Sequence, residues 1–269
     1  MNHLLAPLSA LVLLASTPAQ LAAQTPDQPS SPPTLTVPKD LLGDMNLEQR
    51  KAQEAAALKS ASTFHGFTFT DRVAESGIAF QHRIVDDIGR DYKMVHYDHG
   101  NGVLGADVDG DGKTDLYFLT QVGPNRLYRN LGGGKFQDIT EKAGVAVEDR
   151  ISVTGSFADY DNDGDPDLYV TTVKMGNLLF ENDGKGKFTD VTAKSGLGYV
   201  GHSSGAMFFD YDNDGLLDLF LTNVGVYTTS HQGRHGYYTG VDRAFGGHLF
   251  PERTEASRLY KNLGGGKFQ

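Results

Sequence analysis

The sequence predicts an all-β protein built from repeated four-stranded units, and three observations support this prediction. First, an acidic motif of nine residues occurs three times, beginning at Asp107, Asp159 and Asp210. Second, these motifs recur with a period of about 50 residues, the length of one blade of a β-propeller. Third, each motif is followed by short runs rich in aromatic and β-branched residues, which favour strands. The repeats therefore predict four-stranded propeller blades.

The first unit shows the expected strands most clearly. We expect them at about 102–106, 115–120, 126–130 and 135–140, with a Gly-rich hairpin turn before the last strand. A single sheet of this kind cannot bury both of its faces. Neighbouring units must therefore stack on one another.

The acidic motifs have the composition of cation-binding loops. In each motif, carboxylates occupy positions 1, 3, 5 and 9, and Gly occupies position 6. Carboxylates this close together repel one another unless a cation lies among them, and hard oxygen ligands suit Ca²⁺, which takes six to eight oxygens. The Gly allows the backbone to turn sharply around the ion. The predicted Ca²⁺ ligands are the side chains of Asp107, Asp109, Asp111, Asp115, Asp159, Asp161, Asp163, Asp167, Asp210, Asp212, Asp214 and Asp218, together with the main-chain carbonyls of Lys113, Asp165 and Leu216.

Two alternatives explain the same residues. An EF-hand begins in the same way, but it needs a bidentate Glu at position 12, where this chain has Phe118, Val170 and Leu221. Acidic turns without any ion are the second alternative, because Asp, Asn and Gly favour turns. Three copies in register favour metal loops that join strand to strand.

Further motifs repeat in fixed order after the loops. A hairpin of the form Asn-x-Gly is followed by Phe-x-Asp-[Ile/Val]-Thr at 136–140 and 188–192. On these motifs, residues 67–269 resemble the FG-GAP/VCBS repeats of integrin α-chain propellers and of many secreted bacterial proteins. The whole pattern resembles the CRTAC1-like (ASPIC/UnbV-associated) branch. The resemblance implies a seven-bladed propeller with Ca²⁺ in the hairpin loops, and it implies no catalytic residue.

The two ends of the repeat region predict an incomplete propeller. Residues 67–78 resemble the last strand of a preceding blade, and the third unit stops at Gln269, before its last strand is complete. We expect a C-terminally truncated portion of the propeller, since known propellers have at least four blades. We also expect the N-terminal strand to complete the last blade of the full propeller.

The N-terminal region predicts export from the cytoplasm. Residues 1–23 have the short apolar stretch of a signal peptide, although Lys and Arg are absent before it; a buried helix is the alternative. A Pro-rich linker at 24–44 and a helix at 45–62 follow, and the repeats occupy 63–269. We expect a secreted, periplasmic or cell-surface protein.

An insertion at 224–256 lengthens the third unit and is the strongest candidate for ligand binding. Long loops on rigid scaffolds commonly carry binding residues. A loop that packs over the propeller rim is the alternative, and a His-x-Asp-His cluster at 96–99 is a weaker candidate for a transition metal. The candidate ligand-binding residues are Tyr227, His231, Arg234, His235, Tyr237, Tyr238 and Arg243.

Composition narrows the possible functions. The formal net charge of −10 is explained by the acidic loops, and no basic patch suggests nucleic acid. No apolar segment after the signal region is long enough to span a membrane. The preferred interpretation is a secreted Ca²⁺-binding propeller that acts as a binding, adhesion or scaffold module for a protein or glycan.

The alternative function is an extracytoplasmic enzyme acting on polysaccharide, with the 224–256 insertion as its site. The sequence contains no nucleophile motif, no H-E-x-x-H and no Walker loop. The acidic pairs have a spacing that Ca²⁺ already explains. A non-enzymatic role is therefore favoured.

Overall fold

The computed structural model describes residues 51–53, 55–57, 69–85, 102–232, 237–241 and 251–269. The chain divides into two compact units, 1–68 and 69–269. In the first unit, residues 51–53 and 55–57 are helical. The expected signal segment, the Pro-rich linker and the rest of the expected helix lie outside the described residues, as does the cluster at 96–99, so these assignments stay predictions.

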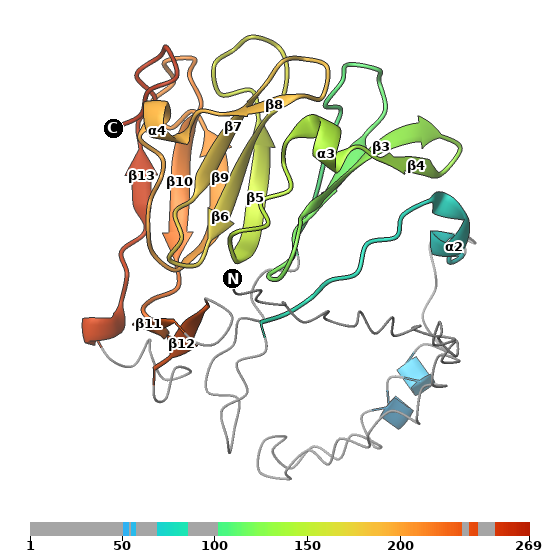
Figure 1. Cartoon of the computed structure of the whole chain (residues 1–269), viewed down its shortest axis with the longest axis horizontal. Coiled ribbons are helices and arrows are strands. Elements are labelled where there is room, and N and C mark those ends of the chain that lie inside the picture. The colour runs from blue at the N-terminus through green and yellow to red at the C-terminus, as the bar shows by residue number, and fades with distance from the viewer. Residues whose placement is uncertain (1–50, 54, 58–68, 86–101, 233–236, 242–250) are drawn as a thin grey trace, which may run out of the picture. The chain divides into compact units, whose positions relative to one another are not determined.

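The second unit begins with two four-stranded antiparallel sheets (Figure 1). The first sheet contains β1 (Val103–Ala106), β2 (Asp115–Phe118), β3 (Arg126–Gly132) and β4 (Lys135–Asp138). The second contains β5 (Ser152–Ala158), β6 (Asp167–Thr172), β7 (Leu178–Asn182) and β8 (Phe188–Asp190). Strands pair in chain order in both sheets. The four strands expected in the first repeat are therefore confirmed, with shifts of a few residues at their ends.

The third sheet is interrupted by the insertion. It contains β9 (Ser203–Phe209), β10 (Asp218–Asn223) and β13 (Arg258–Tyr260), in the order β13-β10-β9. An isolated bridge between Asn262 and Phe268 stands where the other sheets have their fourth strand. Between β10 and β13, the insertion forms a separate hairpin of β11 (Thr228–Gln232) and β12 (Tyr238–Gly240), followed by the 3₁₀ helix η3 (Pro251–Arg253).

The sheets stack, and β6 shows how. All six of its residues are buried. Because alternate side chains of a strand point to opposite faces of the sheet, both faces of this sheet are covered at β6. Leu168 and Val170 pack into a core with residues of the first sheet, whereas Tyr169 packs into a second core with residues of the third. The prediction that neighbouring repeats must cover each other's faces is confirmed. The arrangement is consistent with β-propeller blades.

A short helix precedes each of the three sheets. These are α2 (Val73–Ser76), α3 (Thr140–Ala143) and α4 (Thr192–Ser195), and each ends at a Gly in the left-handed conformation. Gly is needed there because a Cβ on Gly77 would lie 2.5 Å from the carbonyl oxygen of Phe136 in the next sheet. The corresponding distances in the next two repeats are 3.4 Å for Gly144 and 3.3 Å for Gly196. Residues 73–77 therefore contact the first sheet as the end of a preceding repeat would.

The structure bears on two expectations about the ends of the repeat region, the strand within 67–78 and the closure of the propeller. Residues 69–72 form no strand, so the strand expected within 67–78 is not seen among the described residues. Among the described residues, no strand joins the first sheet to the third, so the closure of a propeller is not seen. The number of blades and the truncation stay predictions. No helix within the described ranges is long and apolar enough to cross a membrane.

Candidate metal sites

Three acidic loops connect the first two strands of each sheet. Loop 1 (107–115) joins β1 to β2, loop 2 (159–167) joins β5 to β6, and loop 3 (210–218) joins β9 to β10. The predicted connection of strand to strand is confirmed, and the EF-hand alternative, which needs flanking helices, is wrong. The loops lie at the same end of the sheets, at the top of Figure 1. Loops 2 and 3 touch, because Asn162 Nδ2 donates to the Gly215 carbonyl at 2.9 Å.

The first carboxylate of each loop holds the turn closed. In loop 1, the two oxygens of Asp107 accept from the amides of Asp111 at 3.0 Å and Gly112 at 2.7 Å. The first Asp of loop 2 accepts from positions 5 and 6 at 3.0 and 3.0 Å, and that of loop 3 at 3.1 and 2.9 Å. One set of side-chain to backbone bonds therefore shapes all three loops. This is the local competition with regular structure that Asp favours in turns.

Two residues of each loop adopt the left-handed backbone conformation. The Gly at position 6 has a φ of 81° in loop 1, 101° in loop 2 and 89° in loop 3, as expected from the sequence. Position 4 is also left-handed, with a φ of 63° at Asn162 and 60° at Asn213. Asn tolerates this conformation better than other non-Gly residues, which explains its presence in loops 2 and 3.

The carboxylate at position 9 ties the loop to the sheet. Asp218 is fully buried, and its two oxygens accept from the amides of Tyr211 at 3.2 Å and Asn262 at 2.7 Å. Asp115 and Asp167 make the equivalent pairs of bonds. Position 9 therefore has a structural role in addition to the predicted one as a ligand.

The carboxylates at positions 1, 3 and 9 converge in every loop. Their candidate ligand oxygens lie within 4.8 Å of one another in each of the three clusters. Two position 3 oxygens, Asp109 Oδ1 and Asp161 Oδ1, are buried and have no hydrogen-bond partner. The same is true of Asp165 Oδ1 at position 7 of loop 2. Buried oxygens without a partner are costly unless a cation or donor reaches them. The donor set is all oxygen and suits Ca²⁺.

The position 5 carboxylates lie outside these clusters of three. Asp111, Asp163 and Asp214 each accept from the amide of position 7, at 3.0, 3.2 and 3.0 Å. The predicted position 7 residues Lys113, Asp165 and Leu216 therefore have their amides turned towards position 5.

The electrostatics differ between the loops. Burial, with the nearby charges of Asp161 and Asp163, raises the pKa of Asp167 in loop 2 to about 8. Burial and the charges of Asp163 and Glu181 also raise the pKa of Asp161. In loops 1 and 3 the hydrogen bond from a lysine lowers the pKa of the position 5 carboxyl, Asp111 beside Lys113 and Asp214 beside Lys261.

Asparagines after the loops connect neighbouring sheets. Asn182 donates to the carbonyl of Val108 in loop 1 at 3.0 Å and to that of Pro166 in its own loop at 3.1 Å. Asn262 likewise bonds to Tyr160 in loop 2 at 2.8 Å and to Leu217 at 3.0 Å. The loops thus form one hydrogen-bonded row. Sequence analysis identified these Asn residues as repeats but not as links, because the link joins different repeats.

The insertion residues predicted to bind a ligand fall into three groups. Tyr227 is buried, at 8% exposure, and packs with Ile151, Val153 and Val173. It therefore lies in a core rather than on a binding surface. Tyr237 is partly buried against the same core. The exposed or partly exposed members are His231 and Tyr238, the latter with Lys174 Nζ 4.6 Å from its ring centroid. Arg234, His235 and Arg243 lie outside the described residues.

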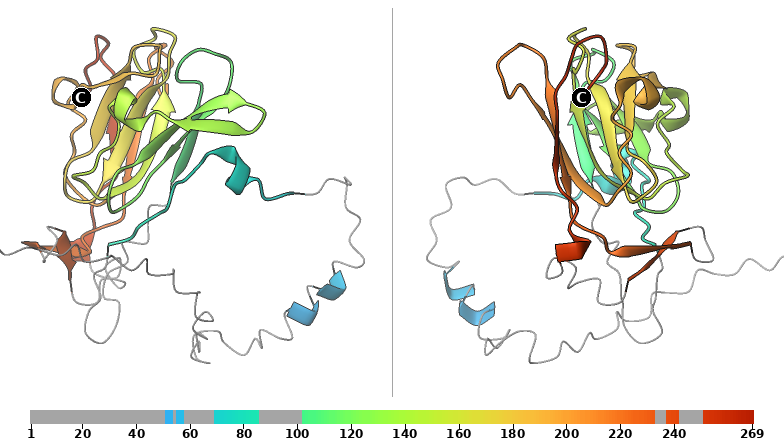
Figure 2. Two further views of the ribbon diagram at one scale, coloured as in Figure 1. Left: turned by 45° about the vertical axis from the view of Figure 1, so that its right-hand side comes forward. Right: turned by 90° about the vertical axis from the view of Figure 1, so that its left-hand side faces the viewer.

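A buried histidine that the sequence analysis did not single out anchors the insertion. His202 is 1% exposed, and its Nδ1 and backbone amide both bond to the carboxylate of Glu255 at 2.7 Å. Its Nε2 lies 2.7 Å from the hydroxyl of buried Thr228. The base of the insertion is also closed by bonds from Asn223 to Ala256 and from Val226 to Arg253. Figure 2 shows the β11–β12 hairpin at the end of the sheets opposite to the acidic loops.

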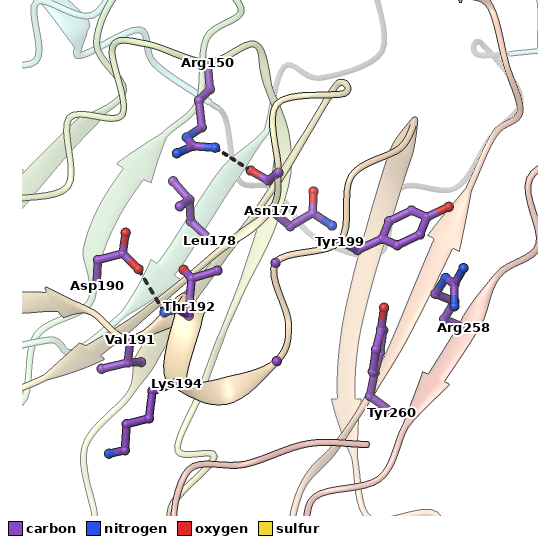
Figure 3. Close-up of a pocket in the computed structure, with 14 residues that line it drawn as sticks. Arg150, Asn177, Leu178, Asp190, Val191, Thr192, Lys194, Tyr199, Arg258 and Tyr260 are labelled. Atoms are coloured by element: carbon purple, nitrogen blue, oxygen red, sulfur yellow. Dashed lines mark hydrogen bonds between the residues drawn. The ribbon is translucent and has the colours of Figure 1, made fainter.

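A pocket of about 930 Å³ lies beside α4, the start of β7 and β13. Figure 3 shows Arg150 on one side of it and Tyr199, Tyr260 and Arg258 on the other. Arg150 donates to the carbonyl of Gly176 at 3.1 Å, and the guanidinium of Arg258 lies 4.5 Å from the centroid of the Tyr199 ring. Cations and aromatic rings of this kind suit a sugar or an anion.

Comparison with known proteins identifies the repeats. The family model of the FG-GAP-like repeat matches residues 107–170 and 159–221, which begin at the first Asp of loops 1 and 2. The chain therefore contains FG-GAP-like repeats.

Cartilage acidic protein 1 is similar to this chain in three vertebrates. The protein of Homo sapiens is 29% identical over 168 residues, which are 58% of this chain and 23% of the relative. The proteins of Mus musculus and Xenopus tropicalis are each 28% identical, over 167 and 168 residues, with the same coverage. The match thus spans about a quarter of the length of these relatives.

Proposed function

We propose that this chain is a secreted, Ca²⁺-stabilised β-propeller module that binds a protein or glycan as an adhesion or scaffold element. The main support is the recurrence of one carboxylate cluster, with one set of hydrogen bonds, in all three loops. The FG-GAP-like repeats and the similarity to cartilage acidic protein 1 support a binding role over an enzymatic one.

Ca²⁺ in these loops would neutralise the end of the sheets where acidic side chains gather. The carboxylates at positions 1, 3 and 9 of each loop would hold the ion, and position 5 and the main chain would complete its shell. A loop filled in this way would be stiffer, because each ligand loses freedom when it binds. Extracellular modules bind Ca²⁺ with a Kd of about 10⁻⁴–10⁻³ M, which suits a structural ion outside the cell.

The partner would contact surfaces away from the metal loops. The insertion offers His231 and Tyr238, and the pocket beside α4 offers cations and aromatic rings. The core packing of Tyr227 and the Glu255–His202 anchor would keep the insertion in place while the insertion binds its partner. Secretion rests on the signal-like segment at 1–23.

The experiment that tests the metal sites is equilibrium dialysis of the full chain against Ca²⁺, with bound ions counted by mass spectrometry. We expect three ions per chain. Replacing Asp161 and Asp163 together by Ala should remove one ion, because the change empties loop 2. Replacing the exposed Glu141 and Glu148 by Ala is the control and should leave three. Unchanged stoichiometry in the loop 2 variant would refute the ligand assignment.

A further inference from the structure

The three repeats differ in the sign of charge at one equivalent position just before the shared Asn, outside the acidic motif. The residue immediately before the shared Asn is Arg129 after loop 1, Glu181 after loop 2 and Lys261 after loop 3. Because the repeats superpose in sequence and in hydrogen bonding, these side chains start from equivalent places, which we call the facing position. The facing position therefore carries a cation beside loops 1 and 3 and an anion beside loop 2, although the three loops have the same hydrogen bonds to their backbone amides.

In loops 1 and 3 the facing side chain is a cation bound to the acidic loop. Arg129 Nε lies 2.5 Å from Asp109 Oδ2, and its Nη2 lies 3.2 Å from Asp111 Oδ2. Lys261 pairs with Asp212, and its Nζ lies 2.8 Å from Asp214 Oδ2. Both cations therefore reach the carboxylates of positions 3 and 5. A metal ion would need the same position 3 carboxylate.

In loop 2 the facing side chain is an anion. The hydroxyl of Tyr160 donates to Glu181 Oε2 at 3.3 Å, and the charge of Glu181 acts on Asp161 at position 3. Among the described residues, no Lys or Arg forms an ion pair with loop 2. Asp161 Oδ1 and Asp165 Oδ1 are buried there without a hydrogen-bond partner. Loop 2 also has five Asp, one more than loops 1 and 3.

The three loops therefore have the same backbone conformation but differ in the charges around them. Loop 1 has four Asp and contains or contacts two cations, Lys113 and Arg129, and loop 3 has four Asp and contacts Lys261. Loop 2 has five Asp and faces a sixth carboxylate, Glu181. A divalent cation is attracted by each carboxylate and repelled by each fixed positive charge within a few ångströms.

We propose that loop 2 is the tightest Ca²⁺ site of the chain, and that the side chain at the facing position sets the affinity of each loop. Arg129 and Lys261 act as built-in competitors: they hold the carboxylates of loops 1 and 3 when Ca²⁺ is scarce and must be displaced when it binds. Glu181 has the opposite effect, because it adds negative charge beside Asp161. As the Ca²⁺ concentration rises, loop 2 fills first. This inference rests on the proposed function, since it assumes that the loops bind Ca²⁺.

The test is isothermal titration calorimetry of the full chain with Ca²⁺, on wild type and three variants. The wild type should show one site that is tighter than the others. Glu181→Arg should weaken this site at least tenfold, because it replaces an anion by a cation beside the ion. Arg129→Glu should create a second tight site in loop 1. Misfolding cannot create a tight site. The Arg129→Glu variant therefore still tests the inference if Glu181→Arg folds poorly.

The control is Glu148→Arg, which makes the same change of charge at an exposed residue before β5, whereas loop 2 follows the far end of that strand. It should leave the tight site within about twofold, since surface charges at long range are screened by salt. Three sites of equal affinity, or a tight site unchanged by Glu181→Arg, would overturn the inference and leave the proposed function standing. A wild-type chain that binds no Ca²⁺ would overturn both.

Discussion

The acidic loops and the insertion differ in how their structure is fixed. The loops occur three times, and their shape comes from bonds within nine residues, such as those from Asp107 to the amides of Asp111 and Gly112. The insertion occurs once, and it is held by contacts between distant residues, such as His202 with Glu255. The shape of each loop therefore depends mainly on carboxylates within the loop itself. The insertion is held in place by contacts between residues that are far apart in the chain.

The largest effect is expected from removing a position 9 carboxylate. Asp218→Ala leaves the buried amide of Asn262 without an acceptor, at about 1–3 kcal/mol, and removes the acceptor of the part-buried amide of Tyr211, at less. We expect the free energy of unfolding to fall by about 1–4 kcal/mol in EGTA, where bound metal makes no contribution. Urea denaturation followed by circular dichroism measures this change.

The matched control for this prediction is Asp214→Ala at position 5 of the same loop. Asp214 is exposed, so its loss should lower the free energy of unfolding in EGTA much less than the loss of Asp218, although both variants should lose Ca²⁺ from loop 3. Equal losses of stability in EGTA would contradict the division between a structural carboxylate and one that serves mainly the metal.

A smaller and local effect is expected at the insertion. Although burial of Glu255 opposes its ionisation, the hydrogen bonds from His202 lower the pKa of Glu255 from its ordinary value of 4.5. The stabilisation from the anchor is therefore present above the ordinary pKa of 4.5 and is lost as the pH falls through the lowered pKa of Glu255. Glu255→Ala at neutral pH should have the same result. We expect the protection of amides in 226–232 against hydrogen exchange to fall by about tenfold, as for a local opening eased by 1.4 kcal/mol.

The exposed Glu252 in η3 provides the comparison for this variant. Glu252→Ala should leave amide exchange in the insertion unchanged, and neither substitution should alter the number of Ca²⁺ ions bound. A loss of bound Ca²⁺ in Glu255→Ala would show that the insertion and the loops are not independent.

The repeated parts could be predicted well from the sequence, because the same pattern of residues occurs in three repeats and supports the same structure in each. The strand positions, the connection of strand to strand and the left-handed Gly at position 6 all follow from residues close together in the chain. The clustering of positions 1, 3 and 9 agrees with the predicted ligand set, whereas position 5 turns towards its own loop amide. The occupancy of these clusters by Ca²⁺ stays a prediction.

The sequence could not predict contacts that occur once or that join different repeats. The residue type of Tyr227 favours a ligand contact, but Tyr227 is buried in a core with Val153. The pairing of His202 with Glu255 spans 53 residues and has no counterpart among the described residues of the other repeats. The role of Arg129, Glu181 and Lys261 was visible in principle, since all three precede the shared Asn, but only the ion pairs show that this position faces the loop.

The central claim is that Ca²⁺ stabilises the repeats through the acidic loops, and thermal unfolding of the full chain tests it most directly. The melting temperature should be measured in EGTA, in Mg²⁺ and in Ca²⁺ at about tenfold excess over the Kd of the weakest site. Three sites would then add at least about 4 kcal/mol, and the melting temperature should rise by at least about 8 °C in Ca²⁺ but little in Mg²⁺. A folded chain with the same melting temperature in all three buffers would contradict the account, because it would show that the loops are acidic turns that bind no metal.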